Sequence, residues 1–96
     1  MAKGYWVATY SAVTKPDSVA AYAKLAAPSI EAAGGKFLAR GNPAKVYEHG
    51  VMQRTVVIEF PSVAAAIAAH DSPGYQAALK VLAGGVEREI RIVEGV

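Results

Sequence analysis

The fold of this chain is decided by residues 55–76, which read TVVIEFPSVAAAIAAHDSPGYQ. The first six of them are β-branched or aromatic except for Glu59, and this composition predicts a strand. Ser62 can then cap an alanine-rich helix, while Ser72 and Pro73 are typical of the first residues of a second helix. We therefore expect a strand and two consecutive helices with almost no loop between them.

The remaining segments complete the same plan. Residues 4–11 are rich in aromatic and β-branched residues and predict the first strand, and apolar residues at helical spacing predict a helix that ends at Gly34. Residues 36–47 and 86–93 predict two further strands. Pro43 interrupts the first of these, and because a proline is tolerated at a sheet edge, we expect this strand at the edge.

The resulting order is strand, helix, strand, strand, helix, strand (βαββαβ), which is a duplicated βαβ unit. It predicts a ferredoxin-like fold of the α+β class, with a four-stranded antiparallel sheet and the helices on one face. The usual strand order 4-1-3-2 of this fold agrees with an edge position for residues 36–47. The chain suffices for one thin core, so we expect a single domain over residues 1–96.

This third strand, which we expect over residues 53–60, has apolar residues on both of its sides. Val56 and Phe60 share one side, whereas Val57 shares the other side with Glu59. A sheet that is wetted on one face normally shows a clean alternation of apolar and polar residues. Large exposed apolar surfaces usually mark interfaces, so we expect the open face to pack on a second copy of the chain. The expected assembly is a homodimer, a dimeric α+β barrel.

The composition argues against several classes of protein. The chain has no cysteine, which excludes disulfides and thiol chemistry. Its net charge of +2 comes from ten basic and eight acidic residues without a basic run, and we therefore expect no nucleic-acid partner. No apolar segment is long enough to span a bilayer, and the amino terminus lacks the apolar core of a signal peptide. We expect a cytoplasmic protein with no membrane partner.

Five blocks of the sequence carry a family resemblance. They read KGYW at residues 3–6, GGKFLARG at residues 34–41, VIEFPS at residues 57–62, DSPGYQ at residues 71–76 and VEG at residues 93–95. In combination they resemble the family called domain of unknown function 1330. The resemblance implies membership of the dimeric α+β barrel superfamily, in which two ferredoxin-like sheets pack face to face. Relatives there include cofactor-free monooxygenases, muconolactone isomerase-like enzymes and haem-dependent dismutases or peroxidases.

Glu59 is the sharpest candidate for a catalytic group. A carboxylate within an apolar strand is expected to be partly buried, and burial favours the protonated form and thereby suits a general base. The alternative is a structural ion pair. If His49-Gly50 forms a two-residue turn, counting back along the two strands sets Arg40 opposite Glu59, and this pair would keep the carboxylate charged.

His70 and Tyr75 are the next candidates. His70 is expected at a helix end, where the helix dipole favours its protonated form, and it could shuttle a proton. It could also be an axial ligand of haem, as in some superfamily relatives, or a helix-end residue without a chemical role. Tyr75 could offer its hydroxyl to a ligand or be a core aromatic residue. Neither His70 nor His49 has a second ligand at a useful spacing, so we expect no metal site.

Three further aromatic residues, Trp6, Tyr10 and Tyr22, are large enough to contribute to a core, an interface or a cofactor site. We expect them in the core or on the dimer surface rather than around a cofactor, and we expect no bound cofactor.

These candidates lead to one functional hypothesis and one competitor. We expect a cleft between helices and sheet that binds small organic molecules, acidic ones among them. The residues expected to line it are Arg40, Glu59, His70 and Tyr75. Glu59 or His70 would be the base in a cofactor-free isomerisation or oxygenation, and Arg40 would hold an anion by bidentate hydrogen bonds. The competing interpretation is a non-enzymatic dimeric module, for ligand binding or a stress response, in which Arg40 and Glu59 are a structural pair.

Overall fold

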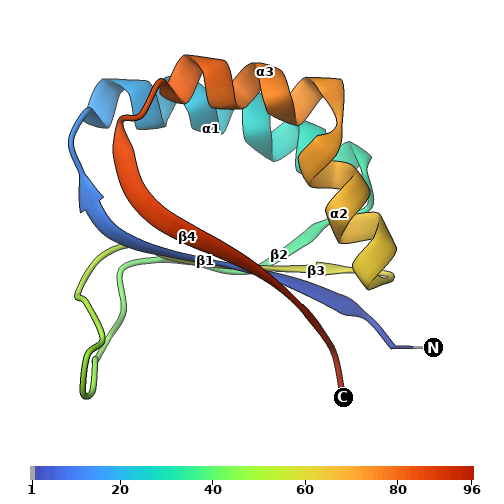
Figure 1. Ribbon diagram of the computed structural model, residues 1–96, viewed down its shortest axis with the longest axis horizontal. Helices are drawn as coiled ribbons and strands as arrows, with labels where there is room; N and C mark the ends of the chain where they lie inside the picture. The colour runs from blue at the N-terminus through green and yellow to red at the C-terminus, as the bar shows by residue number, and fades with distance from the viewer. Residues whose placement is uncertain (1) are drawn as a thin grey trace.

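The computed structural model describes residues 2–96, which form four strands and three helices (Figure 1). The strands are β1 (Gly4–Val13), β2 (Lys36–Gly41), β3 (Thr55–Phe60) and β4 (Val86–Glu94). The helices are α1 (Pro16–Ala32), α2 (Val63–Asp71) and α3 (Pro73–Leu82).

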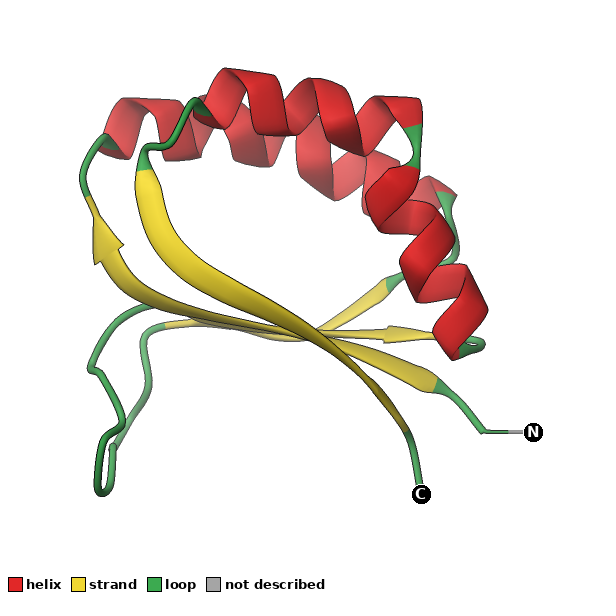
Figure 2. Ribbon diagram, viewed as in Figure 1, coloured by secondary structure: helices red, strands yellow, loops and turns green. Residues whose placement is uncertain are grey.

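The four strands form one antiparallel sheet in the order β2-β3-β1-β4. The three helices all lie on the same face of this sheet, and the other face carries no layer from the described chain (Figure 2). This is the ferredoxin-like α+β fold that the sequence predicts. The edge position of β2 and the strand order 4-1-3-2 are confirmed as well.

The core lies between the helices and alternate residues of β1 and β3. Successive side chains of a strand point to opposite faces, so every second residue of these strands is buried under the helices. These residues are Trp6, Ala8, Tyr10, Val56, Ile58 and Phe60. The helices contribute large side chains to the same core, among them Tyr22 and Ile30 of α1 and Tyr75 of α3. The residues in between belong to the open face of the sheet.

The predicted break between the second and third helices is confirmed. The Ser62 hydroxyl accepts a hydrogen bond from the Ala65 backbone N–H at 3.0 Å and caps α2. The Ser72 hydroxyl donates to the Ala69 carbonyl at 2.7 Å and accepts from the Tyr75 N–H at 3.4 Å, so one side chain ends α2 and caps α3. None of the helices within residues 2–96 is both long and apolar enough to cross a membrane.

The predicted course of the second strand is wrong in two respects. β2 ends at Gly41 rather than at residue 47, and residues 42–54 form a long loop that extends away from the helices (Figure 1). The tight turn in this loop spans residues 47–50, with a hydrogen bond from the Gly50 N–H to the Tyr47 carbonyl at 2.9 Å. The pairing of the strands therefore cannot be counted back from a two-residue turn.

The predicted pairing of Arg40 with Glu59 is consequently wrong. In the sheet Arg40 is opposite Val56, and Glu59 is opposite Lys36. The register also shifts between Phe37 and Ala39. Because residues that are directly paired share a face, Arg40 lies with the buried residue Val56 on the helical side, whereas Glu59 belongs to the open face.

Candidate functional site

A small cavity lies between α1 and the helix-facing side of the sheet. All four strands, α1 and the loop residue Arg54 contribute to its walls. Its volume, taken as the space open to the centre of a water molecule, is about 40 Å³. That space holds about three water molecules or the polar head of a small ligand. One side of the cavity opens to solvent.

The cavity exists because α1 presents short side chains to it. Ala23, Ala26 and Ala27 line the wall that α1 contributes. A methyl group does not reach far from the helix, so the space between α1 and the sheet stays unfilled at these positions. Larger apolar residues close the rest of the wall, including Trp6 and Ile58 from the floor of the sheet. The alanine content of the sequence thus has a specific structural effect here.

Three arginines line the cavity from three different segments. Arg40 comes from β2, Arg54 from the loop before β3 and Arg88 from β4. No aspartate or glutamate is among the lining residues, and none of the ion pairs found within residues 2–96 includes any of the three arginines. The cavity is therefore apolar over most of its wall and cationic at its polar positions.

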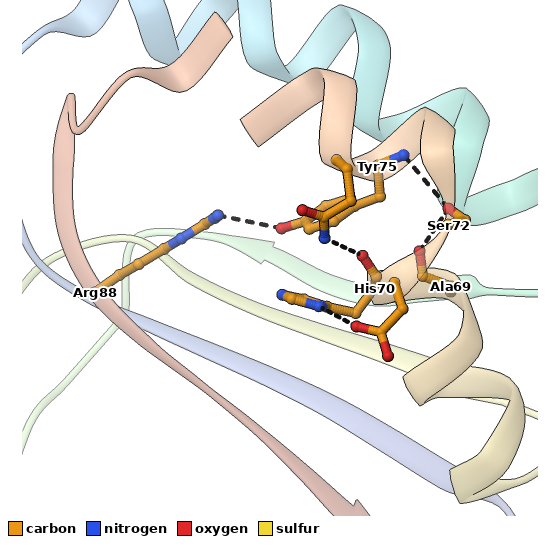
Figure 3. Close-up of polar contacts among 7 residues, drawn as sticks. Ala69, His70, Ser72, Tyr75 and Arg88 are labelled. Atoms are coloured by element: carbon orange, nitrogen blue, oxygen red, sulfur yellow. Dashed lines mark hydrogen bonds and ion pairs between the residues drawn. The ribbon is translucent and has the colours of Figure 1, made fainter. Parts of the chain in front are cut away.

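Arg88 is held by three tyrosine hydroxyls, and we call these four residues the Arg88–tyrosine cluster. Its Nη1 donates to the hydroxyls of Tyr10 at 2.8 Å and Tyr22 at 3.3 Å, and its Nη2 donates to the hydroxyl of Tyr75 at 3.1 Å. The hydroxyls of Tyr22 and Tyr75 share a further hydrogen bond of 2.7 Å. Figure 3 shows Arg88 reaching from β4 to the hydroxyl end of Tyr75 on α3.

The strand pairing and the aromatic rings keep this cation in place. Arg88 is directly paired with Tyr10 across β4 and β1, so both side chains emerge on the helical side. Its guanidinium carbon lies 4.9 Å from the ring centroid of Tyr22 and 5.3 Å from that of Tyr10. At these distances the negative faces of the rings attract the cation. Neutral groups thus hold a charge that a carboxylate would normally hold.

The pKa values of the cluster follow from burial and from these contacts. Burial disfavours the charge of Arg88, but the surrounding oxygens of Tyr22, Tyr75 and Tyr10 outweigh it, so the pKa of the guanidinium is raised and it stays charged. Burial is also the main reason why the pKa of Tyr75 is raised far above its ordinary value, with Tyr22 acting in the same direction and Arg88 opposing it. Tyr75 is therefore a neutral hydroxyl at physiological pH.

Glu59 lies on the other face of the sheet from the cavity. It accepts a hydrogen bond from the Tyr5 hydroxyl at 3.1 Å and one from Lys3 Nζ at 3.5 Å. The hydrogen bond to Glu59 raises the pKa of Tyr5. The prediction of one cleft lined by all four candidate residues is therefore wrong, because the alternation of β3 sends Ile58 and Phe60 to the core and Glu59 to the open face.

His70 also lies outside the cavity lining. Its Nδ1 is 3.1 Å from Asp71 Oδ1, and its ring packs against Trp6 and Tyr75 with centroid separations of 5.6 and 5.2 Å. Figure 3 shows the His70 ring beside Tyr75. A haem at this position would need a large apolar cavity beside the free ring nitrogen, whereas the cavity is small and is not bordered by His70. These residues do not fit a haem. Within residues 2–96 there is no group of three metal-ligating side chains either.

The other sequence candidates reach the site in different ways. Arg40 lines the cavity as predicted, with its guanidinium 4.5 Å from the ring centroid of Phe37. Tyr75 does not line the cavity but supports it through Arg88 and Tyr22. Tyr10 and Tyr22 are core residues as predicted, and their hydroxyls also belong to the site.

The sequence interpretation missed Arg54 and Arg88. The signal for Arg88 is present in β4, where Val86, Arg88, Ile90 and Ile92 share one side of the strand. An arginine among apolar residues on the side that faces the helices indicates a buried cation. Arg54 has no such signal, because the sequence predicts it within the strand at residues 53–60, whereas β3 begins at Thr55 and Arg54 lies in the preceding loop.

The raised pKa of Tyr75 predicts a dependence of stability on alkaline pH. Above the ordinary tyrosine pKa of 10.0 the unfolded chain loses the Tyr75 proton while the folded protein keeps it. The free energy of unfolding should therefore fall between about pH 10 and about pH 12, by about 1.4 kcal/mol per pH unit for this group. Urea denaturation should show a shallower fall in Tyr75→Phe. The exposed Tyr47→Phe should keep the slope, and equal slopes in all three proteins would contradict the assignment.

Solved structures with a similar fold include proteins of several kinds. A protein of unknown function from Rhodopseudomonas palustris (RPA0582) superposes with a TM-score of 0.73 at 20% identity, over 99% of this chain and 83% of that chain. SnoaB, a cofactor-independent oxygenase from Streptomyces nogalater, gives 0.66 at 15% identity, over 97% and 92%. A dimeric ferredoxin-like protein of unknown function from Thermobifida fusca gives 0.54 at 16% identity, over 96% and 90%.

These identities are low, so the similarities establish the ferredoxin-like fold and nothing finer. The chain matches none of the curated proteins with which it was compared. The family model described as domain of unknown function (DUF1330) matches residues 3–96 and therefore almost the whole chain. The resemblance noted in the sequence is thus confirmed, and the chain belongs to the DUF1330 family.

Proposed function

We propose that the protein binds a small organic anion in the cavity between α1 and the sheet. One observation carries this proposal: three arginines line an otherwise apolar cavity that has no carboxylate in its lining. An apolar pocket with a few convergent polar groups is the usual form of a small-molecule site. Guanidinium groups bind carboxylates and related anions by charge-assisted hydrogen bonds.

None of the ion pairs within residues 2–96 joins these arginines to a carboxylate, and this favours binding of an anion over binding of a neutral ligand. Arg88 is removed from most of its water in the folded protein whether or not a ligand is present, so an incoming anion does not have to desolvate it. Arg40 and Arg54 add positive charge at the same cavity. Arg54 is half-buried, so water screens its charge less than that of the exposed Arg40. A neutral ligand of the same shape gains none of this energy. Charge therefore determines affinity here more than shape does.

Binding of benzoate tests the proposal, with the neutral benzamide as its matched ligand. Benzoate should bind at least tenfold more tightly, about 1.4 kcal/mol, because only the carboxylate pairs with the arginines. Isothermal titration calorimetry measures both dissociation constants, and the fluorescence of Trp6, the single tryptophan, reports occupancy of the cavity that it lines. Raising the ionic strength should weaken benzoate binding and leave benzamide binding unchanged.

Three variants separate the site from the rest of the surface. Ala23→Val adds bulk to the cavity wall and should weaken benzoate binding at least tenfold, and Arg54→Gln should weaken it severalfold. Lys80→Gln removes an equal charge from an exposed side chain of α3, a helix that does not line the cavity, and it should bind benzoate as the original protein does. Equal affinities for benzoate and benzamide, or equal effects of Arg54→Gln and Lys80→Gln, would contradict the proposal.

A catalytic use of the same cavity is the second candidate. The positive charge favours the ionised form of an enol-forming substrate, which is the form that reacts with O₂ without a cofactor, and the fold is shared with the cofactor-independent oxygenase SnoaB. In such a reaction a CH₂ group becomes a carbonyl, one atom of O₂ enters the product and the other leaves as water. Isomerisation by proton transfer has less support, since neither Glu59 nor His70 lines the cavity.

Oxygen uptake with 2-indanone, whose CH₂ groups ionise to an enolate, tests the catalytic candidate. An oxygen electrode should record uptake in proportion to protein concentration, and indane-1,2-dione should form in equal amount. Ala23→Val should abolish the uptake, while Lys80→Gln should retain it. Uptake no faster than in buffer alone would remove the oxygenation candidate and leave anion binding as the function.

We also propose that two copies of the chain associate through their open sheet faces. Val7 of β1 and Val57 of β3 are directly paired on this face and are half-buried, with Arg91 as the β4 neighbour of Val7. Val93 of β4 adds further apolar surface and is 51% exposed. A second copy would bury these residues symmetrically, and the similar protein from Thermobifida fusca is described as dimeric.

Molecular mass in solution tests the dimer. Light scattering at micromolar concentration should give twice the chain mass of 10.0 kDa. Val57→Lys should give the single-chain mass, because it replaces an apolar residue of this face by a charge that the contact would have to desolvate. Leu25→Lys makes the same type of change at a residue of α1 that is 45% exposed, and it should stay dimeric. A mass of one chain for the original protein would overturn the proposal.

A further inference from the structure

We propose that the Arg88–tyrosine cluster binds the oxygen of an ionised phenol or enol and makes such a group more acidic when it is bound. This inference rests on the proposed function of the cavity and names the ligand class more closely. The ligand would place its oxygen at the cluster and its ring or conjugated carbons against the apolar walls. The preference for an ionised ligand follows from the number of hydrogen-bond donors in the cluster and from how many of these donors its own hydrogen bonds use.

The cluster has more donors than its own hydrogen bonds use. A guanidinium has five N–H groups, and the hydroxyls of Tyr10, Tyr22 and Tyr75 add three O–H groups. The four hydrogen bonds inside the cluster use three N–H groups and one O–H group. Two N–H groups of Arg88 remain, together with the Tyr10 proton and one proton of the Tyr22–Tyr75 pair.

The side chains that line the cavity offer these donors no carboxylate, because none of the lining residues is an aspartate or a glutamate. Each of the three hydroxyl oxygens already accepts one hydrogen bond from Arg88. A neutral phenol would bring one acceptor together with one more donor. A phenolate or enolate brings only an acceptor, and its oxygen takes several hydrogen bonds at once. The cluster therefore discriminates between the two forms of the same molecule.

Electrostatics acts in the same direction. Desolvation of the ligand oxygen opposes ionisation, as it does for any buried acid. Against this stand a fixed guanidinium beside the oxygen and two further arginines at the cavity. Tyr75 cannot replace the ligand as the anion, because it is fully buried and retains its own proton. The charge of Arg88 is therefore available to the ligand.

Titration of 4-nitrophenol tests the inference directly, because its ionised form is coloured. With saturating protein, absorbance between about pH 5 and about pH 9 should give an apparent pKa at least about one unit lower than in buffer, a tenfold change in the ionisation constant. The methyl ether 4-nitroanisole has the same shape and cannot ionise. It should bind at least tenfold more weakly than 4-nitrophenol at the upper end of this range.

Two variants connect the shift to the cluster. Tyr10→Phe keeps the ring but removes the hydroxyl that holds Arg88 Nη1 at 2.8 Å, so the guanidinium is less firmly oriented toward the ligand oxygen and the shift in the pKa of 4-nitrophenol should be smaller. Arg88→Lys keeps a positive charge but loses the planar set of donors, and it should reduce the shift further. Circular dichroism shows whether each variant is folded, and if Arg88→Lys is not, Tyr10→Phe decides. Lys80→Gln, which changes an exposed side chain of α3, should keep the full shift.

The outcomes separate this inference from the proposed function. An unchanged or raised pKa of bound 4-nitrophenol, in a protein that binds benzoate more tightly than benzamide, overturns the inference and leaves anion binding standing. A shift that Tyr10→Phe leaves at full size also overturns it, because the cluster would then not be its source. If neither benzoate nor 4-nitrophenol binds, the inference and the proposed function both fail.

Discussion

The alternation of side chains along β1 governs the rest of this structure. β1 lies between β3 and β4, so its two faces set the two faces of the whole sheet. Trp6 and Tyr10 point toward the helices and begin the core and the cavity, whereas Tyr5 and Val7 point to the open face. A strand cannot exchange one face for the other without a shift of register, which would expose every buried residue it carries. The separation of the arginine cavity from Glu59 follows from this constraint.

Much of the fold could be predicted from the sequence because its signals are local. The caps at Ser62 and Ser72 and the alternating residues of β3 each depend on a few neighbouring residues, and the structure confirms them. The register of β2 could not be predicted, since it depends on the length and shape of the loop at residues 42–54. The sequence predicts the turn at His49-Gly50, but the turn spans residues 47–50, and Arg40 is therefore paired with Val56 rather than with Glu59.

The site was harder to predict than the fold, and for a different physical reason. The sequence favours Glu59 as a site residue because a charged residue is unusual within an apolar strand. In the structure that carboxylate is hydrogen-bonded to Lys3 and Tyr5 on the open face. Arg88 is the more unusual residue, since it is a cation on the helix-facing side of β4 with only hydroxyls as hydrogen-bond partners. Its three tyrosine partners come from β1, α1 and α3, which are distant in the sequence and meet only in the folded chain.

The short side chains of Ala23, Ala26 and Ala27 allow the size and the charge preference of the cavity to change independently. Larger residues at these positions would shrink the space beside α1, while the arginines on the strands and the loop would stay as they are. Substitutions of the three arginines would alter the charge and leave the wall formed by α1 unchanged. A single helix face therefore gives this fold a simple route to new ligands: related chains could accept molecules of different bulk while still requiring a negative charge.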